Sequence, residues 1–185
     1  MDYYELLKRN RKKPLADMDT IGSDKNFIRL DYGKDAIEKI IAHRDPFLLV
    51  DKLLAVNIQD GEETIIGSRF ISQDEPVFRG HFPAFPVYPG SLQLEMGGQL
   101  GLCLSYFVFN RKTSIDADAK MVNVRATKVL GALFLEPLLP GNDVLMISKR
   151  LEYDGYFGTV LSQVISEGKV CTVSIAEVIF LEEDE

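Results

Sequence analysis

Hydrophobic positions divide the chain into one long helical segment and several segments that alternate as strands do. Residues 92–109 are almost continuously apolar, which is enough for about five turns of helix. Because this segment has no polar face, we expect it to be buried on every side. In the last strand-like segment one face carries Cys171, Val173, Ile175, Ile179 and Leu181.

Turn residues and caps place the remaining elements. Asp60-Gly61, Asp154-Gly155 and Glu167-Gly168 are signals for tight turns between strands. Ser91 follows Pro89-Gly90 and is a good N-cap for the long helix. The predicted elements are short helices within 2–11 and 36–41, strands at 48–58 and 64–70, the helix at 91–109, and strands at 121–130, 143–153, 157–166 and 169–181.

A strand pair, one long buried helix and an antiparallel meander make an α+β domain. The economical packing is a curled antiparallel sheet wrapped round the helix, which is the hotdog fold. We assign this domain to residues 35–185, with Asp35 as a cap for its first helix. Residues 1–34 are polar, mixed in charge and weakly patterned, and we interpret them as an N-terminal extension.

Length and charge limit the classes of function. At 185 residues the chain fits one domain with a full core. The formal net charge of −7 argues against nonspecific binding to nucleic acid. The basic segment 8–13 is the exception, and a solvated arm is favoured there over a docking site for an acidic partner.

The cysteines and the N-terminus favour a reducing, cytoplasmic setting. Cys103 and Cys171 have no metal-ligand spacing, so two buried structural thiols are expected. The acidic, aromatic start at residues 2–5 excludes an ordinary secretory signal. The apolar stretch 92–109 contains Gln93, Glu95, Gln99 and three glycines, so we expect no membrane span.

The segment 79–95 carries the candidate chemistry. His81 stands just before a turn stiffened by prolines, and Glu95 lies one turn into the apolar helix. A histidine in such a turn, taken alone, is more often structural. A carboxylate on an apolar helix is costly to bury, and an interaction with the helix dipole offsets only part of that cost. A functional Glu95 is therefore favoured. The prolines that stiffen the turn after His81 are Pro83, Pro86 and Pro89.

These residues suggest acid–base chemistry on a carbonyl compound. Burial raises the pKa of a carboxyl group, so Glu95 is expected to act as a general acid near neutral pH. Gln99, one helical turn on, could orient Glu95 through a hydrogen bond. The free amides of Gly90 and Ser91 could polarise a carbonyl oxygen. We found no metal-ligand cluster or dinucleotide fingerprint and expect no cofactor.

Three ordered blocks resemble the β-hydroxyacyl-acyl-carrier-protein dehydratases of fatty-acid synthesis. The first is His43-Arg-Asp-Pro-Phe-Leu-Leu-Val-Asp51. The second joins Gly80-His-Phe-Pro83, Pro86-Val-Tyr-Pro-Gly90, Leu94-Glu95 and Gln99. The third, Phe134-Leu-Glu-Pro-Leu-Leu-Pro-Gly141, is the weakest. The resemblance covers about residues 36–182.

The resemblance implies a homodimer with a hotdog fold, alone or as a trimer of dimers. His81 would take the α-proton of a (3R)-hydroxyacyl thioester, and Glu95 of the other subunit would protonate the departing hydroxyl. The product would be a trans-2-enoyl thioester in fatty-acid or related acyl or polyene synthesis, with acyl carrier protein as the partner. The carbonyl would bind amides near Gly90. A glutamate at position 95 is like the branch that dehydrates without isomerising.

Several positions depart from the family pattern. Ala84-Phe85, Tyr88 and Met96-Gly97-Gly98 reshape the expected pocket and leave the acyl length open. Phe85 and Tyr88 either line an acyl tunnel or pack the loop, with neither favoured. Where the family has basic residues for its carrier protein, this chain has Leu133, Leu135 and Glu136. For His43 a structural role is favoured.

Two other functions remain open from the sequence. The same fold could support thioester hydrolysis or hydration of an enoyl-CoA. It could also serve a non-catalytic protein that binds acyl thioesters, because a fold does not determine a function. A binding protein would have no need of both His81 and Glu95, so dehydration is favoured.

Overall fold

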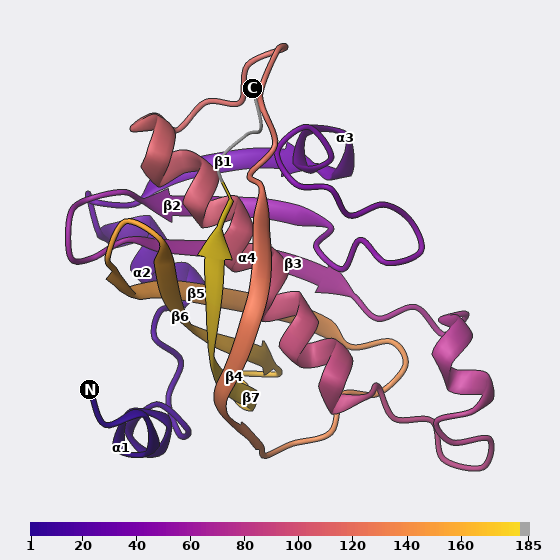
Figure 1. Ribbon diagram of the computed structural model, residues 1–185. Coiled ribbons are helices and arrows are strands. Elements are labelled where there is room, and N and C mark those ends of the chain that lie inside the picture. The colour runs from indigo at the N-terminus through magenta and orange to yellow at the C-terminus, as the bar shows by residue number, and fades with distance from the viewer. Residues whose placement is uncertain (182–185) are drawn as a thin grey trace.

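A single antiparallel sheet curls round one long helix in the computed structural model, which describes residues 1–181, with the backbone only at Met18 and Thr20 (Figure 1). The strands are β1 (Ile28–Gly33), β2 (Lys52–Asn57), β3 (Thr64–Phe70), β4 (Val124–Phe134), β5 (Asp143–Tyr153), β6 (Phe157–Ser166) and β7 (Lys169–Phe180). The helices are α1 (Tyr3–Arg9), α2 (Met18–Ser23), α3 (Lys34–Ile37) and α4 (Gly90–Asn110), with a 3₁₀ helix η1 (Pro76–Arg79).

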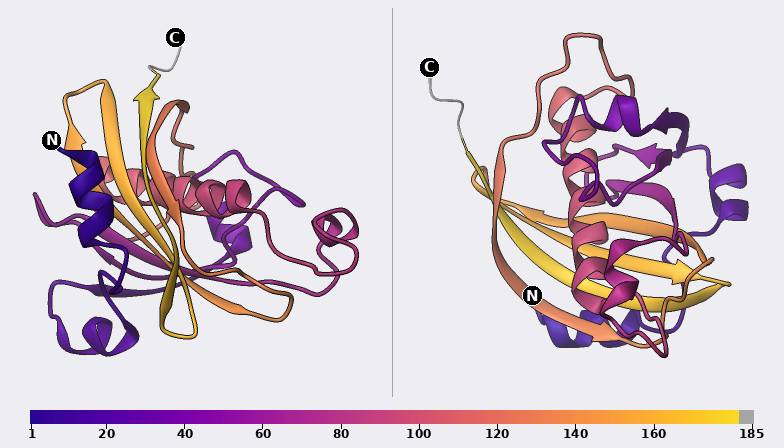
Figure 2. Two further views of the ribbon diagram at one scale, coloured as in Figure 1. Left: turned by 90° about the horizontal axis from the view of Figure 1, so that it is seen from below. Right: turned by 90° about the vertical axis from the view of Figure 1, so that its right-hand side faces the viewer.

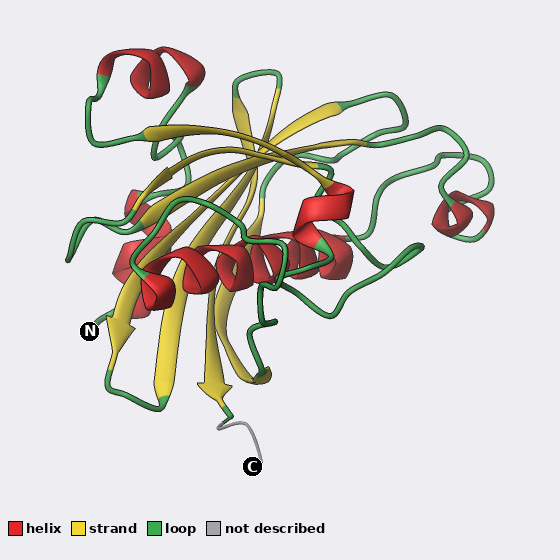
Figure 3. Cartoon of the chain, turned by 90° about the horizontal axis from the view of Figure 1, so that it is seen from above, coloured by secondary structure: helices red, strands yellow, loops and turns green. Residues whose placement is uncertain are grey.

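The strand order is β1-β2-β3-β5-β6-β7-β4, and every neighbouring pair is antiparallel. The helix α4 lies across the strands on the concave side of this sheet (Figure 3). This arrangement confirms the predicted hotdog fold. The last four residues of the predicted domain, 182–185, lie outside the described residues. Within residues 1–181 no helix has the length and hydropathy needed to cross a membrane.

Gly97 allows α4 to come close to the sheet. Ser148, Ser162 and Ser174 stand opposite one another on β5, β6 and β7. The hydroxyls of Ser148 and Ser162 lie 3.0 and 3.2 Å from the carbonyl oxygen of Gly97. A Cβ at Gly97 would lie 2.6 Å from Ser162 Cβ, and one at Gly101 would lie 3.2 Å from a Val160 methyl. These two glycines thus let the sheet approach, which gives a packing reason for their cost in helix propensity.

One face of α4 is only partly covered, so the expectation of a helix buried on every side is wrong. Buried side chains such as Met96, Leu100 and Phe107 face the sheet and the β1–β3 region. Residues three and four apart lie on one helix face. The stripe that lies along the side of strands β4, β6 and β7 is only partly covered, and it consists of Ser91, Leu94, Glu95, Gly98, Leu102 and Ser105.

The N-terminal extension covers the outer, convex face of the sheet (Figure 2). Leu7, Ala16 and Ile21 are buried there against apolar side chains of the strands, including Leu161 and Val173. The contact between Leu7 and β4 is tight, since a Cβ at Gly131 would lie 2.6 Å from the Leu7 side chain. The extension thus shields apolar sheet residues that would otherwise face water.

Gln163 fastens the extension to the sheet. Its side chain is fully buried on the convex face. The amide nitrogen donates to the carbonyls of Asn10 and Lys13, at 2.6 and 3.0 Å, and the amide oxygen accepts from the Leu15 amide at 2.7 Å. The backbone at the end of the basic segment is therefore held, while the side chains of Arg11, Lys12 and Lys13 are exposed.

Several predicted boundaries differ from the structure. The extension contains a strand, β1, which pairs with β2 and which its weak hydrophobic pattern did not reveal. Strand β4 lies three to four residues later than predicted. Helix α4 begins at Gly90 after Pro89, so Ser91 is in the first turn and is not the N-cap. Likewise Gly33, rather than Asp35, precedes the first turn of α3.

Adjacent glycines on α4 should respond in opposite ways to the same change. Gly97→Ala is expected to destabilise the protein by about 1–3 kcal/mol, because its methyl group would overlap Ser162. Gly98→Ala, whose methyl group would meet no neighbour within 4 Å, is expected to stabilise it by up to about 1 kcal/mol. Urea unfolding of both variants measures the difference. Equal effects would contradict the close approach at Gly97.

Gln163→Ala should loosen the extension. It leaves the carbonyls of Asn10 and Lys13 and the amide of Leu15 without their partner, at an expected cost of about 1–3 kcal/mol in the free energy of unfolding. Gln73→Ala is the control, because Gln73 is exposed and the change should stay within about 0.5 kcal/mol. Limited proteolysis within residues 8–15 should accelerate in the first variant only.

Candidate active site

The loop after η1 holds His81 in one orientation. Its backbone amide donates to the Val77 carbonyl at 3.0 Å, and its carbonyl accepts from the Val87 amide at 3.0 Å. Its ring atom Nδ1 lies 2.8 Å from the carbonyl oxygen of Val87. A carbonyl can only accept, so Nδ1 carries the proton, and in the neutral ring Nε2 keeps a free lone pair. His81 is therefore set up as a base through Nε2.

His81 borders an open cavity of about 660 Å³ at the start of α4. Gly90 and Ser91 line the same cavity. The Pro89 carbonyl accepts from the amides of Leu92 and Gln93, whereas no loop carbonyl among residues 1–181 accepts from the amides of Gly90 and Ser91. Unpaired amides at a helix N-terminus attract negative charge. The geometry thus fits the predicted polarisation of a carbonyl oxygen beside His81.

Glu95 is held by two residues from different parts of the chain. Its Oε1 accepts from Nε2 of Gln99 at 2.9 Å and lies 3.2 Å from Nε2 of His43. The hydrogen bond expected from Gln99 is therefore present. About a third of the Glu95 side chain (33%) remains exposed, so the carboxylate is open on its other side.

Gln99 is a positioning residue. It is buried, and its side chain accepts from the Leu49 amide and donates to the Phe47 carbonyl, both at 2.8 Å, in addition to Glu95. These bonds tie the segment that carries His43 to α4. Its side-chain amide is thus taken up by protein groups, and the bond to Glu95 fits the orienting role that the sequence suggested.

His43 is the histidine that lies beside Glu95 within the chain. The sequence favoured a structural role for it and gave no reason to place it here, because 52 positions separate the two residues. Its Nδ1 is buried and has no hydrogen-bond partner among the described residues. The only signal in the sequence was that His43 opens the first of the three family-like blocks.

The pKa of Glu95 is lowered, which corrects the expectation that burial would raise it. The hydrogen bond from His43 lowers the pKa most, and the bond from Gln99 and the charge of His43 add to this effect. Burial acts in the opposite direction and is outweighed. The partial exposure of Glu95 explains why, since desolvation raises a carboxyl pKa strongly only when the group is well buried.

Glu95 lines a second cavity of about 380 Å³ between α4 and strands β4, β6 and β7. Most of its walls are formed by small or apolar residues, among them Gly98, Val160 and Ala176, and Lys128 also lines it. Of the two aromatic residues of the loop, Phe85 is 63% exposed and lines neither cavity. Tyr88 lines the His81 cavity, and its ring also packs against Phe78 in the core, where burial raises the pKa of its hydroxyl to about 12.

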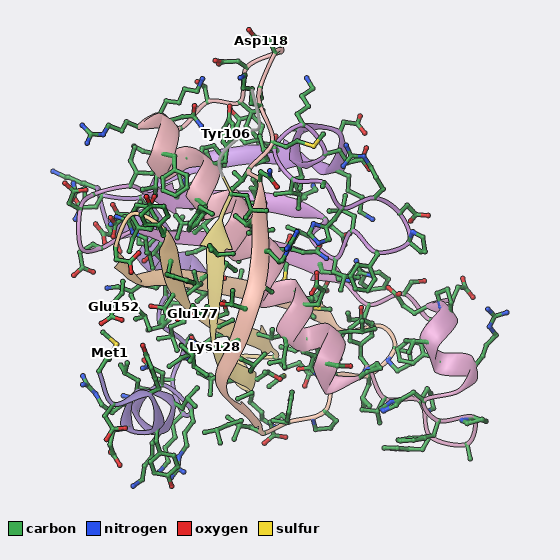
Figure 4. The ribbon with its side chains drawn as sticks, in the orientation of Figure 1. Met1, Tyr106, Asp118, Lys128, Glu152 and Glu177 are labelled. Atoms are coloured by element: carbon green, nitrogen blue, oxygen red, sulfur yellow. The ribbon has the colours of Figure 1, made fainter. Side chains whose placement is uncertain are left out.

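One chain does not bring His81 and Glu95 into one cavity. Each residue lines its own cavity, and Ser91 borders both. The rim beside His81 carries Leu135 and Glu136, and among the described residues no lysine or arginine lines that cavity. Near the Glu95 cavity Lys128 on β4 is paired with Glu177 on β7 at 3.1 Å (Figure 4).

Known proteins share this sequence and fold. The FabA-like domain family matches residues 41–171. A Campylobacter jejuni (strain 81-176) protein named 3-hydroxyacyl-[acyl-carrier-protein] dehydratase FabZ is 38% identical over 118 residues, covering 64% of this chain and 71% of its own. A Polynucleobacter asymbioticus protein of the same name is 38% identical over 127 residues, covering 69% and 76%.

Solved structures agree on the fold. The dehydratase heterocomplex ApeI:P from Xenorhabdus doucetiae matches with a TM-score of 0.56 at 15% identity, over 80% of this chain and 91% of that one. The TT0310 protein of Thermus thermophilus matches with 0.52 at 18% identity, over 75% and 100%. The fold and the residues of the site define a hotdog protein. The chain belongs to the FabA-like family.

The pKa of Glu95 should rise when His43 is removed. In His43→Ala the largest lowering influence is lost while burial remains. Because the folded pKa is lowered from 4.5, its contribution to stability is present above pH 4.5 and is lost as the pH falls through the folded pKa. Carbon-13 NMR of the labelled carboxyl group, and unfolding from pH 7 to pH 3, measure both effects.

The acid-induced loss of stability should therefore be smaller in His43→Ala than in the wild type. Glu95→Gln is the control, because it removes the titrating group and with it this part of the pH dependence. An unchanged carboxyl pKa in His43→Ala would show that His43 does not interact with Glu95 in solution.

Proposed function

We propose that the protein is a dehydratase of 3-hydroxyacyl thioesters carried on acyl carrier protein. Membership of the FabA-like family and the names of the similar proteins support this reaction. The observation that carries the proposal is the arrangement at the start of α4. His81, with a free Nε2, and Glu95, with an open carboxylate, lie in cavities that both border Ser91.

The reaction follows from these groups. Nε2 of His81 takes a proton from C2 of the substrate, and the electrons of that bond form the double bond between C2 and C3. The bond between C3 and oxygen breaks, and Glu95 gives the leaving oxygen its second proton, so that water departs. The amides of Gly90 and Ser91 stabilise the charge on the thioester oxygen. A proton passes back from His81 to Glu95 to restore both groups.

The proton on Glu95 is shared with His43. The lowered pKa keeps Glu95 ionised over a wider pH range than an isolated carboxyl group. An acid of that kind needs a neighbouring proton carrier, and Nε2 of His43 lies 3.2 Å from its Oε1. In this proposal Glu95 and His43 act together as the acid, and Gln99 fixes the carboxylate.

The proposed active form is a homodimer. Strand β4 pairs only with β7 in the described chain, and Arg125 to Val129 are exposed along it. An unpaired edge strand is a template for pairing with a second copy. Residues of this edge also line the Glu95 cavity, and the adjoining stripe of α4 is open. Pairing through β4 would let His81 of one subunit meet Glu95 of the other.

The proposal includes acyl carrier protein as the carrier of the substrate's acyl group. Acyl carrier protein is the carrier in the names of the similar proteins. The cavity beside His81 is rimmed by Phe134, Leu135 and Glu136, without lysine or arginine. Turnover on acyl carrier protein and on coenzyme A, compared at the same acyl group, shows which carrier the protein prefers. Release of a free acid in place of an enoyl thioester would instead indicate a thioesterase.

Subunit complementation tests the shared site. His81→Ala and Glu95→Gln should each lose about 10²–10⁴-fold in kcat, because each removes one proton-transfer group. When the two variants are unfolded together and refolded, about one quarter of the wild-type activity should return. Half of randomly formed dimers are mixed, and each keeps one intact site.

The double variant, refolded with either single variant, should restore nothing, which controls for residual activity. Full activity of both single variants would contradict the roles of His81 and Glu95. Two inactive variants that fail to complement, although they form mixed dimers, would place the whole site within one chain.

A further inference from the structure

Three glycines lie on α4 after its first turn, and only one of them has no packing reason to be a glycine. Gly97 and Gly101 face the sheet at distances that leave little room for a side chain. Gly98 is exposed, and a Cβ there would meet no atom within 4 Å. A glycine in an exposed helix interior costs about 1 kcal/mol relative to alanine. Its stability cost is therefore not offset by packing within the chain.

The space beside Gly98 belongs to the Glu95 cavity. Gly98 follows Glu95 by three residues on the open stripe of α4, about 4.5 Å further along the helix axis. The cavity continues to Ser105, about 15 Å beyond Glu95 along the same axis. Small side chains on the facing strands, which are Ala126, Ser162, Ser174 and Ala176, form part of the walls, and Thr127, Lys128 and three valines line the rest.

We propose that Gly98 determines which acyl chains the protein accepts, because the chain passes over it. This inference rests on the proposed function. With the thioester carbonyl at Gly90 and Ser91 of the subunit that supplies His81, and the C3 oxygen at Glu95 of the other subunit, the rest of the acyl chain runs along the α4 stripe of that second subunit toward Ser105. A four-carbon acyl group ends beside Glu95, whereas a ten-carbon group extends past Gly98. A side chain at position 98 would close the groove to the longer group.

A second copy of the chain is the competing occupant of this space. If the partner's helix packed against Gly98, a larger residue there would weaken the dimer. Substitution would then affect all substrates alike. The two cases differ in oligomeric state and in how the loss depends on acyl length.

The experiment compares the wild type, Gly98→Ala and Gly98→Leu. The quantity measured is kcat/KM for 3-hydroxydecanoyl and 3-hydroxybutyryl thioesters on one carrier. Gly98→Leu should lower the ratio of the long to the short substrate by at least about tenfold, the smallest effect expected when a pocket loses room for a methylene group. Gly98→Ala should lower it less while raising the melting temperature.

Gly33→Ala is the matched control, since a Cβ there also meets nothing within 4 Å and Gly33 lines neither cavity. It should leave the ratio unchanged. Sedimentation of each variant reports the oligomeric state. An unchanged ratio in Gly98→Leu, an equal loss for both substrates, or a variant that becomes monomeric would each overturn the inference.

Failure of the proposed function would look different. If the wild type dehydrates neither substrate, the dehydratase proposal falls, and binding of decanoyl and butyryl thioesters then tests Gly98 alone. Selective loss of decanoyl binding in Gly98→Leu would support the inference. Equal binding of decanoyl thioester by the wild type and Gly98→Leu would overturn it.

Discussion

The close contact between α4 and the sheet at Gly97 is the constraint on which the rest of the site depends. Hydroxyls of Ser148 and Ser162 meet the Gly97 carbonyl, and the absence of a Cβ lets the two surfaces touch. This contact sets the rotation of the helix about its axis. Because residues three and four apart share a face, it also turns Glu95 and Gly98 into the cavity between α4 and strands β4, β6 and β7. The position of Glu95 thus follows from the packing of one turn of α4 against the sheet.

The buried side-chain amide of Gln99 links Glu95 to the first family-like block, residues 43–51. Gln99 holds Glu95 on one side and the backbone around Phe47 and Leu49 on the other, which brings His43 to the carboxylate. A buried polar group is stable only when its bonds are satisfied, and Gln99 meets this requirement by joining three segments. The electrostatics follow from the same contacts, since His43 and Gln99 lower a carboxyl pKa that burial alone would raise.

The convex face of the sheet is covered by the chain itself. Apolar strand residues there are covered by the protein's own N-terminal extension, through Leu7 and the bonds made by Gln163. Parts of both faces of the sheet are therefore covered within a single chain, while the edge of β4 and one stripe of α4 stay open. The open surfaces adjoin the Glu95 cavity, so a second copy of the chain or a substrate bound there would lie next to Glu95.

The sequence by itself determined the sheet and helix class, most strand positions, the two buried thiols and the loop and helix that carry His81 and Glu95. Hydrophobic periodicity and turn residues are local signals, and they suffice for these features. Strand β1, the pairing of His43 with Glu95 and the direction of the Glu95 pKa were decided only by the tertiary structure. Each depends on contacts between residues far apart in the chain. Propensity and spacing are local properties, so they do not show which distant segment will pack against a given residue.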